Sequence, residues 1–424
     1  MKSSMLFMII GAMVGALLMY LKDFRTDSTV MVQDGIRLEE TFQEFAKAID
    51  SAGSFVQAHK WYGSPQEQAE AYRHILRGLI SAIELKAMSD PDFPYFHEVS
   101  PFSKGGMDNA DQRYLTTMIN GEASYKVWGS RGTTRRLDFT LYQAGSPMAP
   151  SFATLSTEQL VTDTNGDFEL YIGGAPQASN WLPGHVGTMR LLIRQIHSNW
   201  PMEAPGQIHI DRIDMDRPLY PVLTREIMAE RLRNATNTFA EDLRRWPELS
   251  RTRFSMLMPA NRLTPPQDTG KEGGLAQRWM VGGHFELAED EALIITAHPT
   301  EADYQGIQLG HHWWESLDYA NRQSSLSLDQ THVSSDGAIY FVISNEDPGV
   351  TNWLDAEGYS RGVILMRYDG MPSPLRQEQK PVANLVKLNE LREHLPADEP
   401  RVSTEQRAET ISERRRHVQL RYGL

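Results

Sequence analysis

The tripeptide Asn-Trp-Leu occurs twice in this chain, as Asn180-Trp181-Leu182 and as Asn352-Trp353-Leu354. In each copy a turn ending in glycine and a strand-like run precede the tripeptide, and a proline stands four residues before the asparagine. A glycine, an apolar run and an arginine follow, ending at Arg194 in the first copy and at Arg367 in the second. Self-similarity of this kind indicates a duplicated structural unit.

Short runs typical of β-strands surround both copies, from Phe96 to about Asp216 and from Arg278 to Tyr368. No helical pattern alternates with the runs inside either block, which argues against a parallel α/β sheet. The turn sequences Asn120-Gly121 and Asn165-Gly166 predict hairpins. We therefore expect a mainly β protein with peripheral helices, built from two related units that resemble a β-sandwich or jelly roll.

Helical patterns lie outside these blocks, the first of them from about Leu38 to Ser54. Ser64-Pro65-Gln66-Glu67 combines an N-cap serine, a proline at the first helical position and a glutamate at the third, and predicts a helix ending near Met88. Further helices are expected near 224–243 and after Ser403. The chain then divides into an anchor (1–22), a helical segment (23–95), a first β unit (96–220), a helix with a linker (221–275), a second β unit (276–372) and a helical tail (373–424).

The run from Met5 to Leu21 contains no charged residue and follows a transmembrane helix pattern. Its length is near the lower limit for a membrane span, which typically takes about 20 residues. A cleaved signal peptide is the alternative, but Met19-Tyr20-Leu21-Lys22 is a poor cleavage site. We expect an uncleaved single-pass anchor in a bacterial inner membrane, with residues 5–21 in the lipid bilayer and a periplasmic body.

Composition excludes several classes of protein. The 424 residues carry 42 lysines and arginines against 55 aspartates and glutamates, a formal net charge of −13. This balance argues against nucleic acid as the main partner, because proteins that bind it present a basic face. The chain has no cysteine, so disulfides, thiolate catalysis and iron–sulfur clusters are excluded.

The residues around both tripeptides resemble a known family, domain of unknown function 1214, which is often paired with domain of unknown function 1254. The resemblance is loose over residues 90–370 and close around Asn180-Trp181-Leu182-Pro183 and Asn352-Trp353-Leu354-Asp355. It implies a β-rich architecture related to double jelly rolls, and trimeric assembly, but no established activity. The chain departs from the paired form by its membrane anchor and its helical N-terminal segment.

The stretch His311-His312-Trp313-Trp314-Glu315 is the densest group of functional side chains, and the first copy has no counterpart. If it is a strand, His311, Trp313 and Glu315 share one face and His312 and Trp314 the other. Imidazole and carboxylate groups beside aromatic rings suit acid–base catalysis or contact with a sugar. His311, His312 and Glu315 are therefore candidate catalytic residues, and Trp313 and Trp314 candidate ligand-binding residues. A strand with one packed aromatic face is the alternative.

The two tripeptides have a structural and a functional interpretation. In the structural one, asparagine bonds the backbone of a turn while tryptophan and leucine pack against the sheets. Duplication favours this interpretation, because a fold determinant has to be present in both copies. In the functional one, the tripeptides and the arginines that follow them bind a ligand, with these candidate residues: Asn180, Trp181, Arg194, Asn352, Trp353 and Arg367.

Metal and cofactor signals are weak. His209-x-Asp211 and His284-x-Glu286 each place an imidazole and a carboxylate on one strand face, and with His298 they form a weak metal-site hypothesis. Ordinary satisfied or exposed histidines are the favoured interpretation, so we assign no metal ligand and no cofactor. The sequence contains no phosphate-binding loop, dinucleotide fingerprint or Gly-x-Ser-x-Gly elbow.

Two functions remain open. The first is an anchored envelope protein that binds a carbohydrate-like or other small ligand, or assembles with itself into a homo-oligomer. The second is an enzyme that acts on a sugar or a lipid-like substrate at the stretch from His311 to Glu315. A deep pocket with convergent acids at that stretch would favour the enzyme, and burial of its rings between sheets would weigh against it.

Overall fold

The computed structural model describes residues 37–143, 151–216, 219–270 and 273–424. Residues Leu38–Leu424 form one compact unit. The expected anchor at residues 5–21 lies outside the described residues. Within the described ranges, no helix is both long enough and apolar enough to cross a membrane.

The described chain is mainly β, as the strand patterns predict, and its first block forms two sheets. Sheet A has the strand order β1-β2-β8-β4-β5, and sheet B has the order β7-β6-β3-β9. The strands of sheet A are β1 (His97–Glu98), β2 (Gln112–Asn120), β8 (Thr188–Ile196), β4 (Arg136–Gln143) and β5 (Ala153–Leu155). Those of sheet B are β7 (Trp181–Leu182), β6 (Asp167–Ile172), β3 (Tyr125–Ser130) and β9 (Ile208–Arg212).

The second block also forms two sheets. Sheet C has the order β10-β12-β19-β14-β15, with β11 on β12 and β16 on β14, and sheet D has the order β18-β17-β13-β20. The strands of sheet C are β10 (Arg262–Leu263), β11 (Gln267–Asp268), β12 (Arg278–Glu286), β14 (Tyr304–His311), β15 (Glu315–Ser316), β16 (Ser325–Ser327) and β19 (Arg361–Asp369). Those of sheet D are β13 (Glu291–Ala297), β17 (Ile339–Ser344), β18 (Trp353–Asp355) and β20 (Val382–Lys387).

The two blocks repeat one topology. Strands β2-β8-β4 of sheet A correspond in chain order to β12-β19-β14 of sheet C, and all of sheet B corresponds to all of sheet D. Each Asn-Trp-Leu tripeptide enters a short strand, β7 or β18, which runs parallel to β6 or β17. The repeated sequence motif therefore marks the same place in two copies of one strand arrangement.

Each block closes around its own apolar core. Alternate residues of β6 are buried, and Phe168, Leu170 and Ile172 pack against Leu191 and Ile193 of β8. In the second block, side chains from sheets C and D form the larger core, with Phe285, Ile295 and Ile364 fully buried. Burying this apolar surface is the main stabilising contribution to each pair of sheets.

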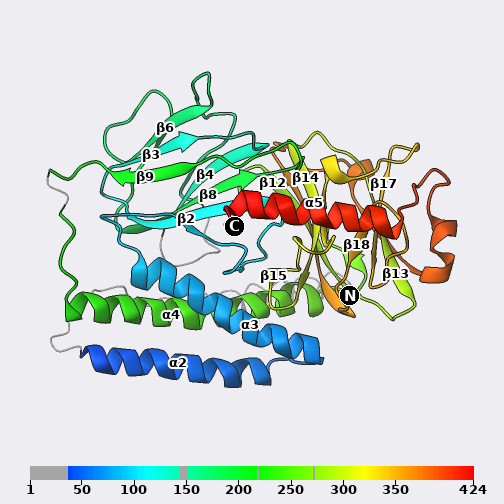
Figure 1. Ribbon diagram of the computed structural model, residues 1–424, viewed down its shortest axis with the longest axis horizontal. Helices are drawn as coiled ribbons and strands as arrows, with labels where there is room; N and C mark the ends of the chain where they lie inside the picture. The colour runs from blue at the N-terminus through cyan, green and yellow to red at the C-terminus, as the bar shows by residue number, and fades with distance from the viewer. Residues whose placement is uncertain (1–36, 144–150, 217–218, 271–272) are drawn as a thin grey trace, which may run out of the picture. The chain divides into compact units, whose positions relative to one another are not determined.

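Sheets A and C lie side by side in the middle of the compact unit (Figure 1). The hydroxyl of Tyr304 on β14 donates to Asp111, which directly precedes β2, at 2.6 Å. The hydroxyl of Ser327 donates to the carbonyl of Ser198 at 2.6 Å. The two central sheets therefore face each other, and the residues on these facing surfaces belong to neither apolar core.

The described residues include four α-helices, of which α2 packs on α3 and α4: α2 (Leu38–Ala58), α3 (Pro65–Ala82), α4 (Arg225–Ser250) and α5 (Thr404–Tyr422). The expected capping box is confirmed, because Ser64 Oγ accepts from the Glu67 amide and Glu67 Oε2 accepts from the Ser64 amide. Helices α3 and α4 continue as the π-helical turns η1 (Ile83–Met88) and η2 (Arg251–Ser255). Three 3₁₀ turns also lie within the described residues: η4 (Leu328–Gln330), η5 (Gln377–Gln379) and η6 (Leu388–His394).

The hairpin predictions are wrong. Strand β2 ends at Asn120 in sheet A, while the next strand, β3, lies in sheet B. The turn at Asn165-Gly166 likewise precedes β6 in sheet B after β5 in sheet A. These turns carry the chain from one sheet to the other.

The tripeptides make the same backbone contacts in both copies. Asn180 bonds the amide and carbonyl of Val161, at 2.8 and 2.7 Å, and Asn352 bonds those of His332, both at 2.8 Å. The indole nitrogen of Trp181 donates to Gly173 O, and that of Trp353 donates to Ser344 O. Each tripeptide thus holds a neighbouring segment against its sheet.

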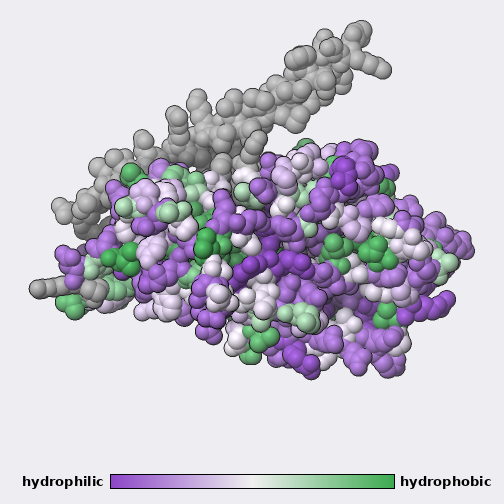
Figure 2. All heavy atoms as spheres, turned by 90° about the horizontal axis from the view of Figure 1, so that it is seen from above, coloured by the Kyte–Doolittle hydropathy of each residue, from purple (hydrophilic) through white to green (hydrophobic). Residues whose placement is uncertain are grey.

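The face of the molecule drawn in Figure 2 is mostly hydrophilic. Its hydrophobic residues form separate small patches and not a continuous surface. A patch wide enough to indicate a large apolar interface is therefore absent from the coloured part of this face.

Candidate functional site

His311 and Glu315 face each other across a tight turn. Strand β14 ends at His311, β15 begins at Glu315, and the two residues are paired in register. Trp314 in the turn has a φ of 67°, in the left-handed region. The expected continuous strand is therefore wrong, because the chain reverses within the five residues. The reversal still places His311 Nε2 3.6 Å from Glu315 Oε2.

Helix α3 adds three side chains to this pair. Glu70, His74 and Arg77 lie on one helix face, because they follow one another at intervals of four and three residues. His74 Nδ1 lies 2.7 Å from Glu315 Oε1, and Arg77 contacts Glu315 Oε2. Glu70 Oε2 lies 3.4 Å from both Arg77 Nη1 and His311 Nε2. This helical spacing is visible in the sequence, but only the fold shows that the face meets β14.

The cluster keeps its carboxylates ionised although it is buried. Burial by itself would raise the pKa of Glu315, but the hydrogen bond and charge of His74 and the charge of Arg77 bring that pKa down to about 2. Burial also acts against ionisation of Glu70, but the hydrogen bond and charge of His311 together with the charges of Arg77 and Arg73 lower its pKa. A buried network with this many charge-assisted contacts holds His311 in one orientation.

A pocket of about 410 Å³ opens beside this cluster, and we call it the His311 pocket. Its walls come from α3, the segment 101–104, the segment 316–321, Glu357 and the end of α5. Lys104 Nζ donates to the carbonyls of Ser316 and Leu317 and lies 4.5 Å from the centre of the Tyr319 ring. The pocket is thus lined by charged groups from five separate parts of the chain.

Glu357 is the most perturbed acid of the pocket. Burial raises its pKa to about 7, although its Oε1 accepts a hydrogen bond of 2.6 Å from the Asp318 amide. Burial also lowers the pKa of Lys104. Titratable groups shifted in this way within a cleft are typical of functional sites. Sequence patterns missed both residues, since neither belongs to a motif.

The other three residues of the stretch point elsewhere. The His312 ring stacks on Trp61 at 3.8 Å, and its Nδ1 lies 2.9 Å from Ser250 Oγ. Trp313 is 1% exposed and packs among α2, α3 and α4. Trp314 stacks on Phe254 at 5.4 Å. The fold therefore separates His312 and both tryptophans from His311 and Glu315, and neither indole ring lines the His311 pocket.

One group of side chains could supply ligand atoms to a metal ion within the described ranges: Glu70, His311 and Glu315. The Arg77 guanidinium already pairs with both of these carboxylates. The charge that a cation would satisfy is therefore supplied by the protein itself. His209, His284 and His298, which the sequence suggested together, do not meet in such a group.

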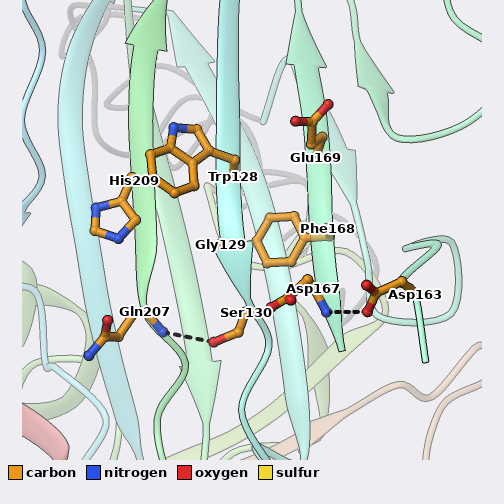
Figure 3. A pocket seen from close by; sticks show the side chains of 9 residues that line it. All are labelled: Trp128, Gly129, Ser130, Asp163, Asp167, Phe168, Glu169, Gln207 and His209. Atoms are coloured by element: carbon orange, nitrogen blue, oxygen red, sulfur yellow. Dashed lines mark hydrogen bonds between the residues drawn. The ribbon is translucent and has the colours of Figure 1, made fainter. Parts of the chain in front are cut away.

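His209 and Asp211 share the outer face of sheet B, as their strand spacing predicts. The Trp128 indole nitrogen donates to Asp211 Oδ2 at 2.6 Å, and its ring lies 4.5 Å from that of His209. Figure 3 shows the groove beside them, of about 570 Å³. One of its carboxylates, Asp163, accepts from two backbone amides of its own turn.

Arg194 and Arg367 do not contact the tryptophans of their own copies. Arg194 donates to Thr140 Oγ1 and Tyr142 Oη, both at 3.0 Å. Arg367 donates to Gln308 Oε1 and to the carbonyl of Met107. Both arginines line a second cavity, between sheets A and C.

The comparisons with known proteins show a shared fold without an assigned activity. No family model matches the chain, and neither does any curated protein. A crystal structure of an uncharacterised protein of Burkholderia cenocepacia is similar, with a TM-score of 0.75 and 27% identity over 82% of this chain and 97% of that one. The VPA0106 protein of Vibrio parahaemolyticus aligns over 82% of this chain and 99% of its own, with 13% identity and a TM-score of 0.46.

Proposed function

We propose that this protein binds a small carbohydrate-like molecule in the His311 pocket. The observation that carries the proposal is the convergence of Lys104, His311 and Glu357, from three distant segments, on one pocket of about 410 Å³. That volume lies in the range typical of small-molecule sites, about 300–1,000 Å³.

The chemistry of the walls suits a ligand rich in hydroxyl groups. Arg73, Lys104 and Arg415 offer donors, while Asp318 and Glu357 offer acceptors, so the charges are mixed. Hydroxyl groups both donate and accept, and they can satisfy such a lining without bringing a net charge. The ring of Phe102, 65% exposed at the pocket, offers an apolar surface for one face of a sugar.

Acid–base catalysis on the same ligand is the second candidate function. Glu357, with a pKa of about 7, can give or take a proton near neutral pH. His311 Nδ1 is buried and has no hydrogen-bond partner among the described residues. These two groups favour an enzyme that acts on a sugar or lipid-like substrate, with His311 and Glu315 in the roles expected from the sequence.

The family, the membrane anchor, the location and the assembly of the protein are also proposals. We propose membership of the domain of unknown function 1214 family, two sandwich-like units of common origin, and a single-pass inner-membrane anchor at residues 5–21 with a periplasmic body. Assembly into a homo-oligomer is proposed on the family resemblance. The two matched strand arrangements support the common origin of the units.

Calorimetric titration with a panel of neutral, acidic and amino monosaccharides tests binding. We expect saturable binding of at least one sugar, and at least five-fold weaker binding by Phe102→Ala, whose ring is largely exposed. Tyr95→Ala removes another exposed ring outside this pocket and serves as the matched control. No binding, or equal binding by both variants, would refute the proposal.

Product analysis of the bound sugar's glycosides separates the two functions. The enzyme predicts turnover that His311→Asn abolishes. Binding without turnover would support ligand binding and contradict the enzyme.

A further inference from the structure

Five arginines line one cavity of about 230 Å³ between sheets A and C, which we call the arginine cavity. They come from three strands and from η2, and they are Arg190, Arg194, Arg253, Arg278 and Arg367. One acidic residue, Asp108, is among the described lining residues. The chain as a whole has a formal net charge of −13, so its composition does not indicate this local concentration of positive charge.

Strand geometry explains how the arginines meet. Arg190 and Arg194 lie four residues apart on β8, so both project from the face of sheet A that is turned away from its apolar core. Arg278 on β12 and Arg367 on β19 project from the corresponding face of sheet C. Three of these arginines act together on the buried hydroxyl of Tyr114. Burial raises the pKa of this hydroxyl, and the charges of Arg367, Arg278 and Arg194 all act to lower it.

Three of the arginines have no carboxylate partner among the described residues. The contacts of Arg194 are the hydroxyls of Thr140 and Tyr142, and its buried Nε has no partner there. Arg367 donates to an amide oxygen and a backbone carbonyl. The Arg190 guanidinium lies 5.0 Å from the centre of the Tyr142 ring.

The acids near the cavity are already used. Asp369 binds Arg278 through both oxygens, at 2.5 and 2.7 Å. Asp108 accepts hydrogen bonds from Ser100 and from the amide and hydroxyl of Ser316. Burial lowers the pKa of Arg190 and Arg367, and neighbouring arginines act in the same direction. Positive charges that are buried without partners are unfavourable unless an anion joins them.

The rest of the wall is apolar and aromatic. Leu192, Met280 and Leu365 come from the two sheets, and the rings of Trp246 and Trp314 come from α4 and from the turn after β14. The cavity is smaller than the roughly 300–1,000 Å³ of drug-sized sites, which limits the ligand to a small molecule and excludes a polymer.

We propose that the arginine cavity binds a small organic anion, a carboxylate or phosphate head group with a short apolar or aromatic portion. Guanidinium groups bind both head groups through paired hydrogen bonds. Arg194 Nε is a donor with no partner among the described residues. The apolar walls take the remainder of the molecule. This site is separate from the His311 pocket and does not depend on the function proposed there.

Calorimetric titration and thermal unfolding of the purified full-length chain test the site at constant ionic strength. The probes are benzoate, phenyl phosphate and inorganic phosphate, with benzamide as the neutral match of benzoate. We expect saturable 1:1 binding of benzoate or phenyl phosphate, a rise of the unfolding temperature with their concentration, and neither effect from benzamide. The stronger of the two aromatic anions identifies the head group.

Substitutions locate the binding. Arg194→Gln and Arg367→Gln keep a hydrogen-bonding side chain without the charge, and we expect each to raise the Kd at least ten-fold. Arg376→Gln removes an exposed arginine on the surface and should leave the Kd unchanged. If either cavity variant fails to fold, the wild-type comparison of benzoate with benzamide decides. Equal responses to these two probes, or affinities unchanged in both folded cavity variants, would overturn the proposal.

Discussion

Arg194 and Arg367 occupy the same position, the seventh of nine residues, in the equivalent strands β8 and β19, and both line one cavity between the central sheets. The sequence repeat marks both arginines but places them 173 positions apart in two separate units. The pairing of the units back to back makes them neighbours. One repeated residue thereby gives two charges to a single site.

Asp369 neutralises part of this positive charge through its buried ion pair with Arg278. Asp369→Asn leaves Arg278 buried without a partner and adds a net positive charge to the cavity, so we expect a loss of about 3–5 kcal/mol in the free energy of unfolding. Denaturant unfolding measures the loss. Glu301→Gln breaks an exposed pair with Arg376 and should lose less than about 1 kcal/mol. Similar losses in both variants would contradict this assignment.

The two repeated tryptophans differ in burial. Trp353 is 6% exposed, within a cluster that includes Val342 and Leu391, whereas Trp181 is half-buried. We expect Trp353→Ala to destabilise the fold by about 3–5 kcal/mol and Trp181→Ala to cost clearly less. Chemical denaturation of both variants checks this order. A normal unfolding temperature for Trp353→Ala would show that the ring is dispensable.

Glu357 should make stability fall as the pH rises. Its pKa is raised from 4.5 to about 7 in the folded state, so the fold binds its proton more tightly than the unfolded chain does. The resulting stabilisation is complete below about pH 4.5 and is lost as the pH rises through 7. Glu357→Gln should remove this dependence and gain up to about 3 kcal/mol relative to the wild type between those limits. Parallel stability curves for the two proteins would count against a protonated Glu357.

Glu315 should act in the opposite direction. Its pKa is lowered to about 2, so its stabilisation is complete above about pH 4.5 and disappears as the pH falls toward 2. Glu315→Gln leaves His74 and Arg77 without their buried partner, and we expect a loss of about 3–5 kcal/mol at pH 7. Acid titration followed by circular dichroism should show this difference shrinking below pH 4. A constant difference would mean that the carboxylate is not ionised in the fold.

Residues Leu38–Leu424 form a compact unit of their own, which bears on the proposed anchor. Deleting residues 1–22 should release the protein from the membrane fraction without changing its unfolding temperature. Fractionation of cells and thermal unfolding of the truncated chain measure the two effects. Loss of folding would show that the run from Met5 to Leu21 contributes to the core.

Local patterns predicted what depends on neighbouring residues. The capping box at Ser64 and Glu67 starts α3 where the sequence places it, because a cap needs only the first turn of the helix. Alternating apolar residues predicted strands such as β6, whose alternate residues are buried. The two Asn-Trp-Leu copies indicated a doubled unit, and the strand orders of the two blocks match. The hairpin predictions were wrong because a turn sequence does not determine which sheet the next strand joins.

The sequence alone determined a mainly β chain with a repeated unit, and it singled out His311, Glu315, Arg194 and Arg367. Only the tertiary structure decided what these residues do, because it brings them together with residues from other elements of the chain. Glu315 meets His74 and Arg77 across 241 and 238 positions. The arginines meet because two sheets turn their outer faces together. Long-range packing follows from the burial of whole faces, which no local pattern encodes.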